Sequence, residues 1–455
     1  MDNLLIGHLS RVRYHREEMK SSAIFMCNSC GNEFPKWAGQ CSVCKEWNSL
    51  SEVTSLARPS SKSRSSGQKN TSPITPKEAL SENLNSHFST NIGEFDRVLG
   101  SGLTRGGVYL IAGQPGIGKS TLLTQLSLSL KQDILYVCSE ENPSQVASRI
   151  QRLNSGKTDY VHLLNTSSLE NILSAVSRQL PAVSLIIVDS IQSIATDLNA
   201  TTAGSPSQIR DCANYLIRTA KETNIPMIIV GHVTKDGDIA GPKMLEHMVD
   251  VVLQLEGDRQ HELRLLRGVK NRFGPTDETG IFKMTGDGLM EVKDPSQFLL
   301  EGRLTKTPGS VLGLIMEGSR PMTAEIQALV VDSAIPIPRR IAKGINANRL
   351  QLICAILTKH LRLPLGTKDV FVNVTGGLNI NEPGVDLAIA LAIISSVKNK
   401  ALPENSICFG ELGLLGEIRN VSFQDKRLKE AKALGYKHIY SPSTHPHLSS
   451  IISKK

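Results

Sequence analysis

The residues from Gly113 to Ser120 read Gly-Gln-Pro-Gly-Ile-Gly-Lys-Ser, which matches the phosphate-binding loop pattern in full. Glycines in such a loop let successive backbone N–H groups point at phosphate oxygens. Lys119 would reach the terminal phosphates, and the Ser120 hydroxyl would ligate Mg²⁺. The stretch therefore predicts a site for a nucleoside triphosphate, which we take to be ATP, together with Mg²⁺.

The segments on both sides of this loop strengthen the prediction. An apolar β-type run, Val108–Ala112, leads into it, and Thr121–Leu126 leaves it with helical apolar spacing. A chance glycine turn would not need a strand before it and a helix after it. The predicted nucleotide-binding residues are Gly113, Gln114, Pro115, Gly116, Ile117, Gly118, Lys119, Ser120 and Thr121.

Further apolar runs along the chain end in polar residues. They are Ile134–Cys138 before Ser139-Glu140-Glu141, Leu185–Val188 before Asp189, Met227–Val230 before Gly231-His232, and Val249–Leu255. Strands that alternate with helices predict a mainly parallel sheet. The site of such a sheet lies at the carboxyl ends of its strands. We therefore expect the polar residues at the strand ends to meet at the phosphate loop.

This position assigns a role to each polar strand end. Asp189 is the predicted second acidic ligand, holding Mg²⁺ through water, and its alternative role is a helix cap. Glu140 is the predicted base that polarises the attacking water, with Glu141 as the fallback. His232 either senses the γ-phosphate or is an ordinary structural histidine.

Cys27, Cys30, Cys41 and Cys44 form two C-x-x-C pairs separated by ten residues. This spacing is typical of a closed tetrahedral site for structural Zn²⁺. A disulfide pair and a redox C-x-x-C are the alternatives, and a reducing compartment favours zinc. We expect Phe34, Trp37, Gly39 and Trp47 to supply the turns and the small apolar cover of this ribbon. The remaining cysteines, Cys138, Cys212, Cys354 and Cys408, lie singly in apolar surroundings and receive no function.

Length and composition set the domain organisation. A chain of 455 residues predicts two or three domains. The formal charge of +8 permits contact with nucleic acid without requiring it. No apolar run is long enough to span a bilayer and no signal-peptide core is evident, so we expect a soluble, cytoplasmic protein. The predicted parts are an N-terminal extension (1–22), a C4 zinc ribbon (23–50), a flexible Ser/Lys/Arg/Pro-rich linker (51–85), an ATPase domain (86–295) and a C-terminal module (300–455).

The order of these motifs, together with Lys270-Asn271-Arg272-Phe273-Gly274, closely resembles the bacterial RadA (Sms) family of DNA repair proteins. The family is related to RecA and to replicative hexameric helicases, and the zinc ribbon at the front fits it. The resemblance runs from about residue 23 to the C-terminus. It implies an α/β RecA-like P-loop ATPase core with an N-terminal zinc ribbon and a C-terminal Lon-protease-like α+β domain.

The resemblance also implies a function. Members drive branch migration of recombination intermediates by ATP-powered movement on single-stranded DNA, so branched DNA, single-stranded DNA and a RecA-type recombinase are the expected partners. The expected assembly is a homo-oligomer, a hexameric ring, without a membrane. In that frame Lys270 and Arg272 would act catalytically near the ATP of the adjacent subunit, or near DNA, stabilising charge on the transferring phosphoryl group.

Two small polar segments are DNA-facing candidates, Ala195–Ser207 and Thr234–Lys243. Loops at these places in RecA-like rings project into the channel and contact the phosphate backbone. Both lack aromatic residues that could stack on bases. We therefore expect flexible loops with mainly electrostatic, sequence-independent contacts.

The C-terminal module resembles the proteolytic domain of Lon, which raises a rival function, an ATP-dependent protease. Such a protease needs a serine activated by a lysine. The resemblance places Gly384 at the nucleophile and Asp425 at the lysine, with Lys426 one residue away. Because glycine has no nucleophile, we expect an inactive scaffold that offers a basic DNA-binding face. The residues expected on that face are Arg339, Arg340, Lys343 and Arg349. A third possibility is a RecA-like regulatory ATPase that acts on proteins without DNA.

Overall fold

A computed structural model describes residues 24–27, 32–34, 36–53, 75, 87–153, 156–178, 183–199, 201–232, 244–257 and 262–452. Cys30, the extension 1–22, nearly all of the linker 51–85 and the segment Thr234–Lys243 lie outside these residues. The chain divides into two compact units, Met1–Ala79 and Leu80–Lys455. In the described part of the chain, no helix is both long and apolar enough to cross a membrane.

The first unit contains a small antiparallel sheet with the strand order β2-β1-β3. Its strands are β1 (Ile24–Cys27), β2 (Glu33–Phe34) and β3 (Leu50–Val53). Cys27, Cys41 and Leu50 form its buried centre. Trp37 and Trp47, which we expected to cover the ribbon, are instead 57% and 70% exposed. The apolar cover of the ribbon is therefore smaller than the sequence predicts.

A nine-stranded sheet forms the centre of residues 87–291, with the order β14-β13-β12-β11-β6-β10-β9-β7-β8. Strands β6 to β11 run parallel, and β12 to β14 extend the sheet antiparallel beside β11. The parallel strands are β6 (Val108–Gly113), β7 (Ile134–Cys138), β8 (Val161–Asn165), β9 (Leu185–Asp189), β10 (Met227–His232) and β11 (Val251–Glu256). The antiparallel strands are β12 (Leu263–Asn271), β13 (Thr279–Thr285) and β14 (Gly288–Glu291). The mainly parallel sheet predicted from the sequence is confirmed.

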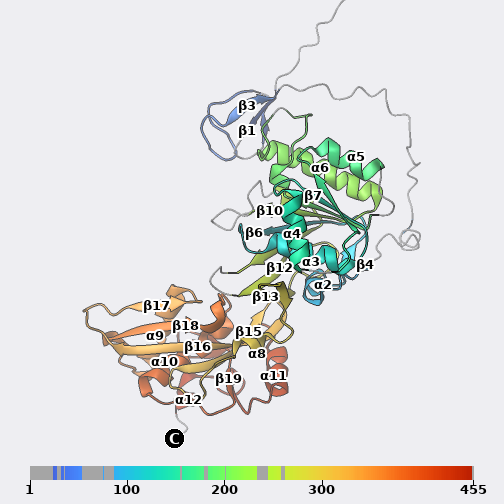
Figure 1. Cartoon of the computed structure of the whole chain (residues 1–455). Coiled ribbons are helices and arrows are strands. Elements are labelled where there is room, and N and C mark those ends of the chain that lie inside the picture. Colours follow the sequence, from blue (N-terminus) through green and yellow to red (C-terminus); the bar gives the residue numbers. More distant parts are fainter. Residues whose placement is uncertain are drawn as a thin grey trace, which may run out of the picture. The chain divides into compact units, whose positions relative to one another are not determined.

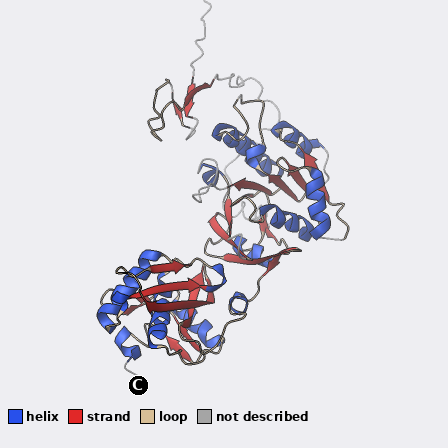
Figure 2. Ribbon diagram, turned by 60° about the vertical axis from the view of Figure 1, so that its left-hand side comes forward, coloured by secondary structure: helices blue, strands red, loops and turns tan. Residues whose placement is uncertain are grey.

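Helices cover both faces of this sheet (Figures 1 and 2). Alternate residues of β6 point to opposite faces, so Tyr109 and Ile111 join one hydrophobic core while Val108 and Leu110 join the other. The first core includes residues of α3 (Lys119–Leu130) and α4 (Pro143–Leu153), and the second includes residues of α5 (Leu169–Arg178) and α6 (Pro206–Thr223). Two short helices, α2 (Gly93–Leu99) and α7 (Met244–Met248), also belong to this part of the chain. Burial on both faces explains why the strands are continuous apolar runs.

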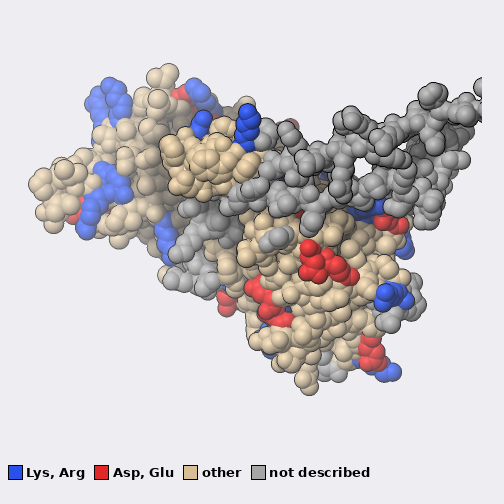
Figure 3. All heavy atoms as spheres, turned by 90° about the horizontal axis from the view of Figure 1, so that it is seen from above, with Lys and Arg blue, Asp and Glu red and all other residues tan. Residues whose placement is uncertain are grey.

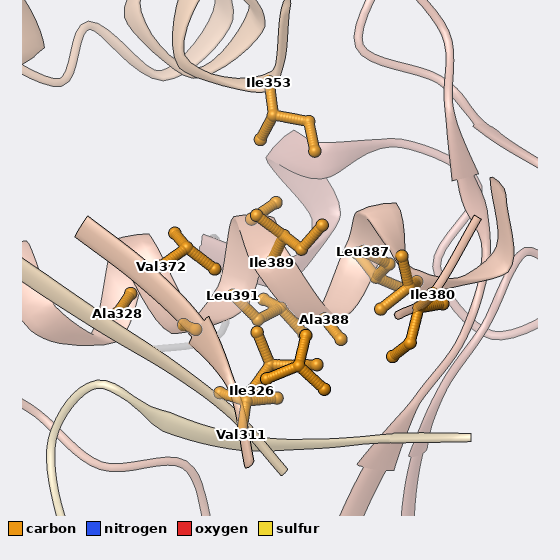
Figure 4. Close-up of a cluster of buried hydrophobic side chains, with 14 of the residues drawn as sticks. Val311, Ile326, Ala328, Ile353, Val372, Ile380, Leu387, Ala388, Ile389 and Leu391 are labelled. Carbon is orange, nitrogen blue, oxygen red and sulfur yellow. The ribbon is translucent and has the colours of Figure 1, made fainter. Parts of the chain in front are cut away.

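The C-terminal part is built on a six-stranded sheet with the order β17-β18-β16-β15-β19-β22. Its strands are β15 (Ser310–Glu317), β16 (Arg320–Asp332), β17 (Arg340–Lys343), β18 (Lys368–Val374), β19 (Ser406–Cys408) and β22 (His438–Tyr440). The main helices are α9 (Ala347–Leu361), α10 (Asp386–Lys398) and α11 (Gln424–Ala433). Nearly every residue of α10 is buried, and Figure 4 shows Ala388 and Leu391 of this helix beside Val311 and Ile326 of the sheet.

The ATPase part and the C-terminal part share a hydrophobic core. Leu263, Leu265 and Ile281 of the antiparallel strands belong to the same buried cluster as Val311 and the α10 side chains. A buried ion pair reinforces this junction, because Arg320 Nη1 lies 3.0 Å from Glu94 Oε2. The division of this unit into two domains near residue 300 remains our proposal.

The segment Ala195–Ser207 differs from the flexible loop that we expected. Thr196 and Gln208 are buried, and the Gln208 side-chain amide donates to the carbonyl oxygens of Thr196, Asn199 and Thr201. Thr196 Oγ1 also donates to Glu170 Oε1 at 2.6 Å. These side-chain hydrogen bonds replace regular structure and fix the segment against α5 and α6.

Candidate active site

The phosphate loop joins the end of β6 to the start of α3, as the sequence predicts. Gly118 has φ of +116°, a conformation that L side chains rarely adopt. At Gly113 a Cβ atom would lie 2.6 Å from the carbonyl oxygen of Leu255 on the neighbouring strand. Both positions therefore require glycine for a local physical reason. Thr121 lies in the first turn of α3 and is partly buried.

Lys119 is almost fully buried at the start of α3. Its Nζ donates to the carbonyl oxygens of Gly113 at 2.7 Å and Gln114 at 3.1 Å. Burial lowers the pKa of Lys119, and the charges of Asp189 and Glu140 oppose that shift. The ammonium is thus held inside the loop, on the side where carboxylates compensate its charge.

His232 connects Lys119 to Glu140. Its Nδ1 lies 3.3 Å from Lys119 Nζ and its Nε2 lies 3.0 Å from Glu140 Oε2. A neutral imidazole that accepts at Nδ1 and donates at Nε2 satisfies both contacts. His232 ends β10, Glu140 follows the end of β7, and Lys119 begins α3 after the loop that follows β6. The parallel topology brings the carboxyl ends of these three strands together. The structure therefore places His232 inside the site.

The two candidate bases occupy different surroundings. Burial tends to raise the pKa of Glu140, but the hydrogen bond from His232 and the charge of Lys119 are among the effects that hold this pKa below its usual value. Glu141 is tied instead to Arg149, whose Nη2 lies 2.6 Å from both of its carboxylate oxygens. Glu140 is therefore the ionised carboxylate that faces the phosphate loop.

Asp189 ends β9 in a buried position next to the same loop. Burial raises the pKa of Asp189, while side-chain hydrogen bonds from Ser120 and Tyr136 counter the shift. The hydroxyl of Tyr136 donates to Asp189 Oδ2 at 2.9 Å. A hydroxyl and a carboxylate side by side are hard oxygen donors of the kind that Mg²⁺ prefers. The side chains of Lys119, Ser120 and Asp189 thus fit a nucleoside triphosphate with Mg²⁺.

Lys270 and Arg272 lie near the amino ends of β6 and β11, at the edge of the sheet opposite the phosphate loop. Lys270 on β12 is paired with Val252 of β11, and Val252 is paired with Leu110 of β6. Leu110 precedes Gly113 by three strand residues, which corresponds to about 10 Å. Neither basic residue therefore belongs to the phosphate loop of its own chain.

The two basic residues also differ from each other. Lys270 Nζ donates to the carbonyl oxygens of Glu246 at 2.7 Å and Val249 at 2.7 Å, which caps the end of α7. Burial lowers the pKa of Lys270, and the charge of Arg272 adds to the shift. The side chain of Arg272 is 57% exposed and lies 3.6 Å from Asp250. Arg272 is thus the freer of the two cations.

The other residues of the Lys270–Gly274 motif build a tight turn. The Asn271 amide donates to the carbonyl oxygens of Leu99 and Pro275, and its Oδ1 accepts the N–H of Phe273. The Phe273 ring packs near Tyr109, with ring centroids 6.3 Å apart. A Cβ atom at Gly274 would lie 2.8 Å from the carbonyl oxygen of Leu99. The motif therefore anchors the end of β12 to α2.

The zinc ribbon has the geometry of a thiolate site. The sulfur atoms of Cys27, Cys41 and Cys44 all lie within 4.8 Å of one another, and the Cys27–Cys44 sulfur distance is 3.6 Å. A tetrahedron with Zn–S bonds of about 2.3 Å has edges of about 3.8 Å. The three described thiols fit zinc, and Cys30, the fourth predicted ligand, lies outside the described residues.

The C-terminal domain corrects our assignment at Gly384. A Cβ atom there would lie 3.1 Å from Arg427 Nη1, so the cation beside Gly384 is Arg427. Lys426 instead donates to the carbonyl oxygen of Ser319, and Asp425 lies in the first turn of α11. Arg427 is fully buried and paired with Glu382. The assignment was wrong because a position in a helix was aligned without knowing which helical face meets Gly384.

The predicted basic face is also smaller than expected. Arg340 donates to the carbonyl oxygens of Lys368 and Leu365, and Arg349 Nε lies 3.1 Å from Asp386. Arg339 is paired with Asp369 but remains half exposed. Lys343 is exposed. Of these four residues, Arg339 and Lys343 are exposed, whereas Arg340 and Arg349 are partly buried and bound to neighbouring groups.

Sequence reasoning missed several residues of the site. Tyr136 touches Asp189, Arg149 pairs with Glu141, and Arg264 Nε donates to the carbonyl oxygen of Ile117 in the phosphate loop at 3.1 Å. Tyr136 lies in an apolar strand, where its polar end was the available signal. Arg264 carries no local signal, because its partner is 147 residues away.

Three known families match separate parts of the chain. Residues 25–52 match a family described as rubredoxin metal binding domain, residues 87–238 match one described as AAA domain, and residues 344–445 match one described as subunit ChlI of Mg-chelatase. The first match agrees with the thiolate cluster, and the second includes the phosphate loop. The chain thus has an ATPase core with a zinc ribbon, and its cofactors are ATP, Mg²⁺ and Zn²⁺.

Curated relatives are similar over nearly the whole chain. DNA repair protein RadA of Bacillus subtilis (strain 168) is 43% identical over 433 residues, which cover 93% of each chain. The protein of the same name from Rickettsia bellii (strain RML369-C) is 43% identical over 448 residues, covering 96% of this chain and 98% of the relative. The one from Campylobacter jejuni (serotype O:2) is 44% identical over 428 residues, covering 93% and 94%. This chain belongs to the family of the DNA repair protein RadA.

Proposed function

We propose that the protein is a DNA-dependent ATPase of homologous recombination and DNA repair, which promotes branch migration by ATP-driven movement on single-stranded DNA. The observation that carries the proposal is the hydrogen-bonded row Lys119–His232–Glu140 beside Asp189. Family membership supports the link to repair. Single-stranded DNA, branched intermediates and a RecA-type recombinase are the proposed partners.

The side chains of the site divide the chemistry of hydrolysis among them. Bound MgATP supplies the phosphoryl group that is transferred. Lys119 binds the terminal phosphates, Ser120 and Asp189 hold the metal, and Glu140 orients and polarises the attacking water. His232 donates to Glu140 and contacts Lys119. It would therefore sense whether a γ-phosphate is bound at the loop.

We propose a hexameric ring in which the end of β12 from one subunit approaches the phosphate loop of the next. The distance of Arg272 from its own loop and its exposure support this arrangement. Arg272 would stabilise charge on the transferring phosphoryl group of the neighbour. Lys270, which holds α7, would link hydrolysis to the DNA-facing segment before that helix.

The absence of protease chemistry is part of the proposal. Gly384 supplies no nucleophile, and the cation beside it, Arg427, cannot act as a base because guanidinium does not deprotonate in proteins. The domain would act as a scaffold for the ring. ATP-dependent cleavage of casein by the purified chain would contradict this part of the proposal.

The lysine and arginine residues of the described chain do not form one continuous patch on the face shown in Figure 3, where blue and red groups are scattered. That face therefore does not by itself identify a DNA-binding surface.

Steady-state ATP turnover with and without single-stranded DNA tests the proposed dependence on DNA. We expect stimulation that weakens as salt rises, and no turnover by Lys119→Ala. Turnover that ignores DNA at low and high salt would favour a regulatory ATPase instead.

A further inference from the structure

A buried tyrosine hydroxyl lies directly behind the acidic residue of the active site. Tyr136 is 1% exposed, and its Oη donates to Asp189 Oδ2 at 2.9 Å. Asp189 pairs with Cys138 across β7 and β9, and Tyr136 lies two residues before Cys138 on the same face. The tyrosine thus reaches its partner along the diagonal of neighbouring strands, a distance that an aromatic side chain spans.

The Asp189 carboxylate needs such a partner. The terminal torsion of an aspartate is broad and allows the carboxylate plane to rotate. The charges around Asp189 do not favour one orientation of its carboxylate, because the cations Lys119 and Arg149 attract it while the anions Glu140 and Glu141 repel it. A neutral hydroxyl fixed by a buried ring sets the plane without adding a charge.

We propose that Tyr136 is a positioning residue for the metal site, holding the Asp189 carboxylate in the orientation that faces Ser120. This inference rests on the proposed role of Asp189 as a ligand that holds Mg²⁺ through water. Partners of this kind orient metal-binding side chains, and their removal typically weakens metal affinity by about 10-fold to 100-fold. Tyr136 itself touches neither nucleotide nor metal in this scheme.

The test is metal binding to the full-length protein with ADP, using Mn²⁺ as the probe and the electron paramagnetic resonance signal of free Mn²⁺ as the readout. Tyr136→Phe removes the hydroxyl and keeps the ring. We expect Mn²⁺ to bind about 10-fold more weakly, while the affinity for ADP in EDTA stays unchanged. Unchanged Mn²⁺ affinity, or an equal loss of metal-free ADP affinity, would overturn the proposal.

A matched control is available in the same sheet. Tyr109 on β6 is also 1% exposed, and its hydroxyl accepts the N–H of Thr104 at 2.6 Å. Tyr109→Phe removes a buried hydroxyl whose hydrogen-bond partner is Thr104 and not Asp189, so it should leave Mn²⁺ affinity unchanged. An equal loss in Tyr109→Phe would mean that any buried hydroxyl of this sheet has the same effect, which contradicts positioning.

A double-mutant cycle separates this inference from the proposed function. Asp189→Asn alone should weaken Mn²⁺ binding, and if it does not, the assigned role of Asp189 fails. If Tyr136 acts through Asp189, Tyr136→Phe should add less than 2-fold in the Asp189→Asn background. A full additional loss in that background would overturn the positioning role while leaving Asp189 in place. Thermal unfolding of each variant confirms that folded protein is compared.

Discussion

Lys119 at the start of α3, His232 at the end of β10 and Glu140 just after β7 form one row of hydrogen bonds at the carboxyl edge of the sheet. The arrangement distinguishes Glu140, the base that the sequence predicts, from the adjacent Glu141, the fallback. Glu140 faces the loop, and Glu141 is bound to Arg149. Two adjacent residues of the chain therefore have different surroundings, and Glu140 is the one for which we propose the role of base.

Replacing Glu140 tests this distinction. Glu140→Gln should lower kcat by about 100-fold or more, because the amide cannot accept a proton from water. Glu141→Gln is the matched control and should have a much smaller effect on kcat. The measurement is steady-state ATP turnover, with nucleotide binding followed separately. A larger loss in Glu141→Gln would reverse the assignment.

Asp386 predicts a pH dependence of stability. Burial raises the pKa of Asp386 to about 6, although the Arg349 guanidinium opposes the shift. Between about pH 4 and pH 6 the folded state therefore binds more protons than the unfolded state, so stability falls as pH rises through this window. The loss would be about 3 kcal/mol.

Urea unfolding of the wild type and of Asp386→Asn at several pH values measures this contribution. The advantage of the wild type over the variant should shrink as pH rises from 4 to 6.5. A difference that is constant, or that grows with pH, would contradict the raised pKa.

At the scale of elements, the sequence predicted the strands that appear in it as continuous apolar runs. Val108–Ala112 and Leu185–Val188 are apolar without a break because helices cover both faces of the sheet. The pairings that the sequence did not predict join distant residues, such as Tyr136 with Asp189 and Arg427 with Gly384. Periodicity reports the face that a residue occupies, but not the residue that meets it across the fold.

The Glu94–Arg320 pair gives a prediction at this scale, because it joins α2 to β16. Glu94 is 6% exposed at its side chain, and Arg320 is 15% exposed. Arg320→Met would remove the closer of the two cations that pair with this buried carboxylate, because Arg97 Nε also lies 3.4 Å from Glu94 Oε1. The free energy of unfolding should therefore fall by up to about 3 kcal/mol. Urea unfolding measures the loss. Arg218→Met is the control, because its pair with Glu222 is exposed and should contribute little.

At the scale of the whole molecule, the phosphate loop and Arg272 lie at opposite ends of one sheet. A ring would bring the two ends together from different subunits. Mixing Lys119→Ala with Arg272→Ala tests this arrangement. Each variant alone should hydrolyse ATP poorly, whereas mixed rings contain interfaces with an intact loop and an intact Arg272. Turnover above the sum of the separate variants is expected, and strict additivity would contradict a shared site.

Branch migration on a synthetic three-strand recombination intermediate tests the central claim most directly, namely that ATP hydrolysis at the phosphate loop drives movement on DNA. The account predicts ATP-dependent extension of the paired region by the wild type, none by Lys119→Ala, and a loss in Lys270→Ala although this variant still binds nucleotide. Equal extension by the wild type and Lys119→Ala, or extension without ATP, would contradict it.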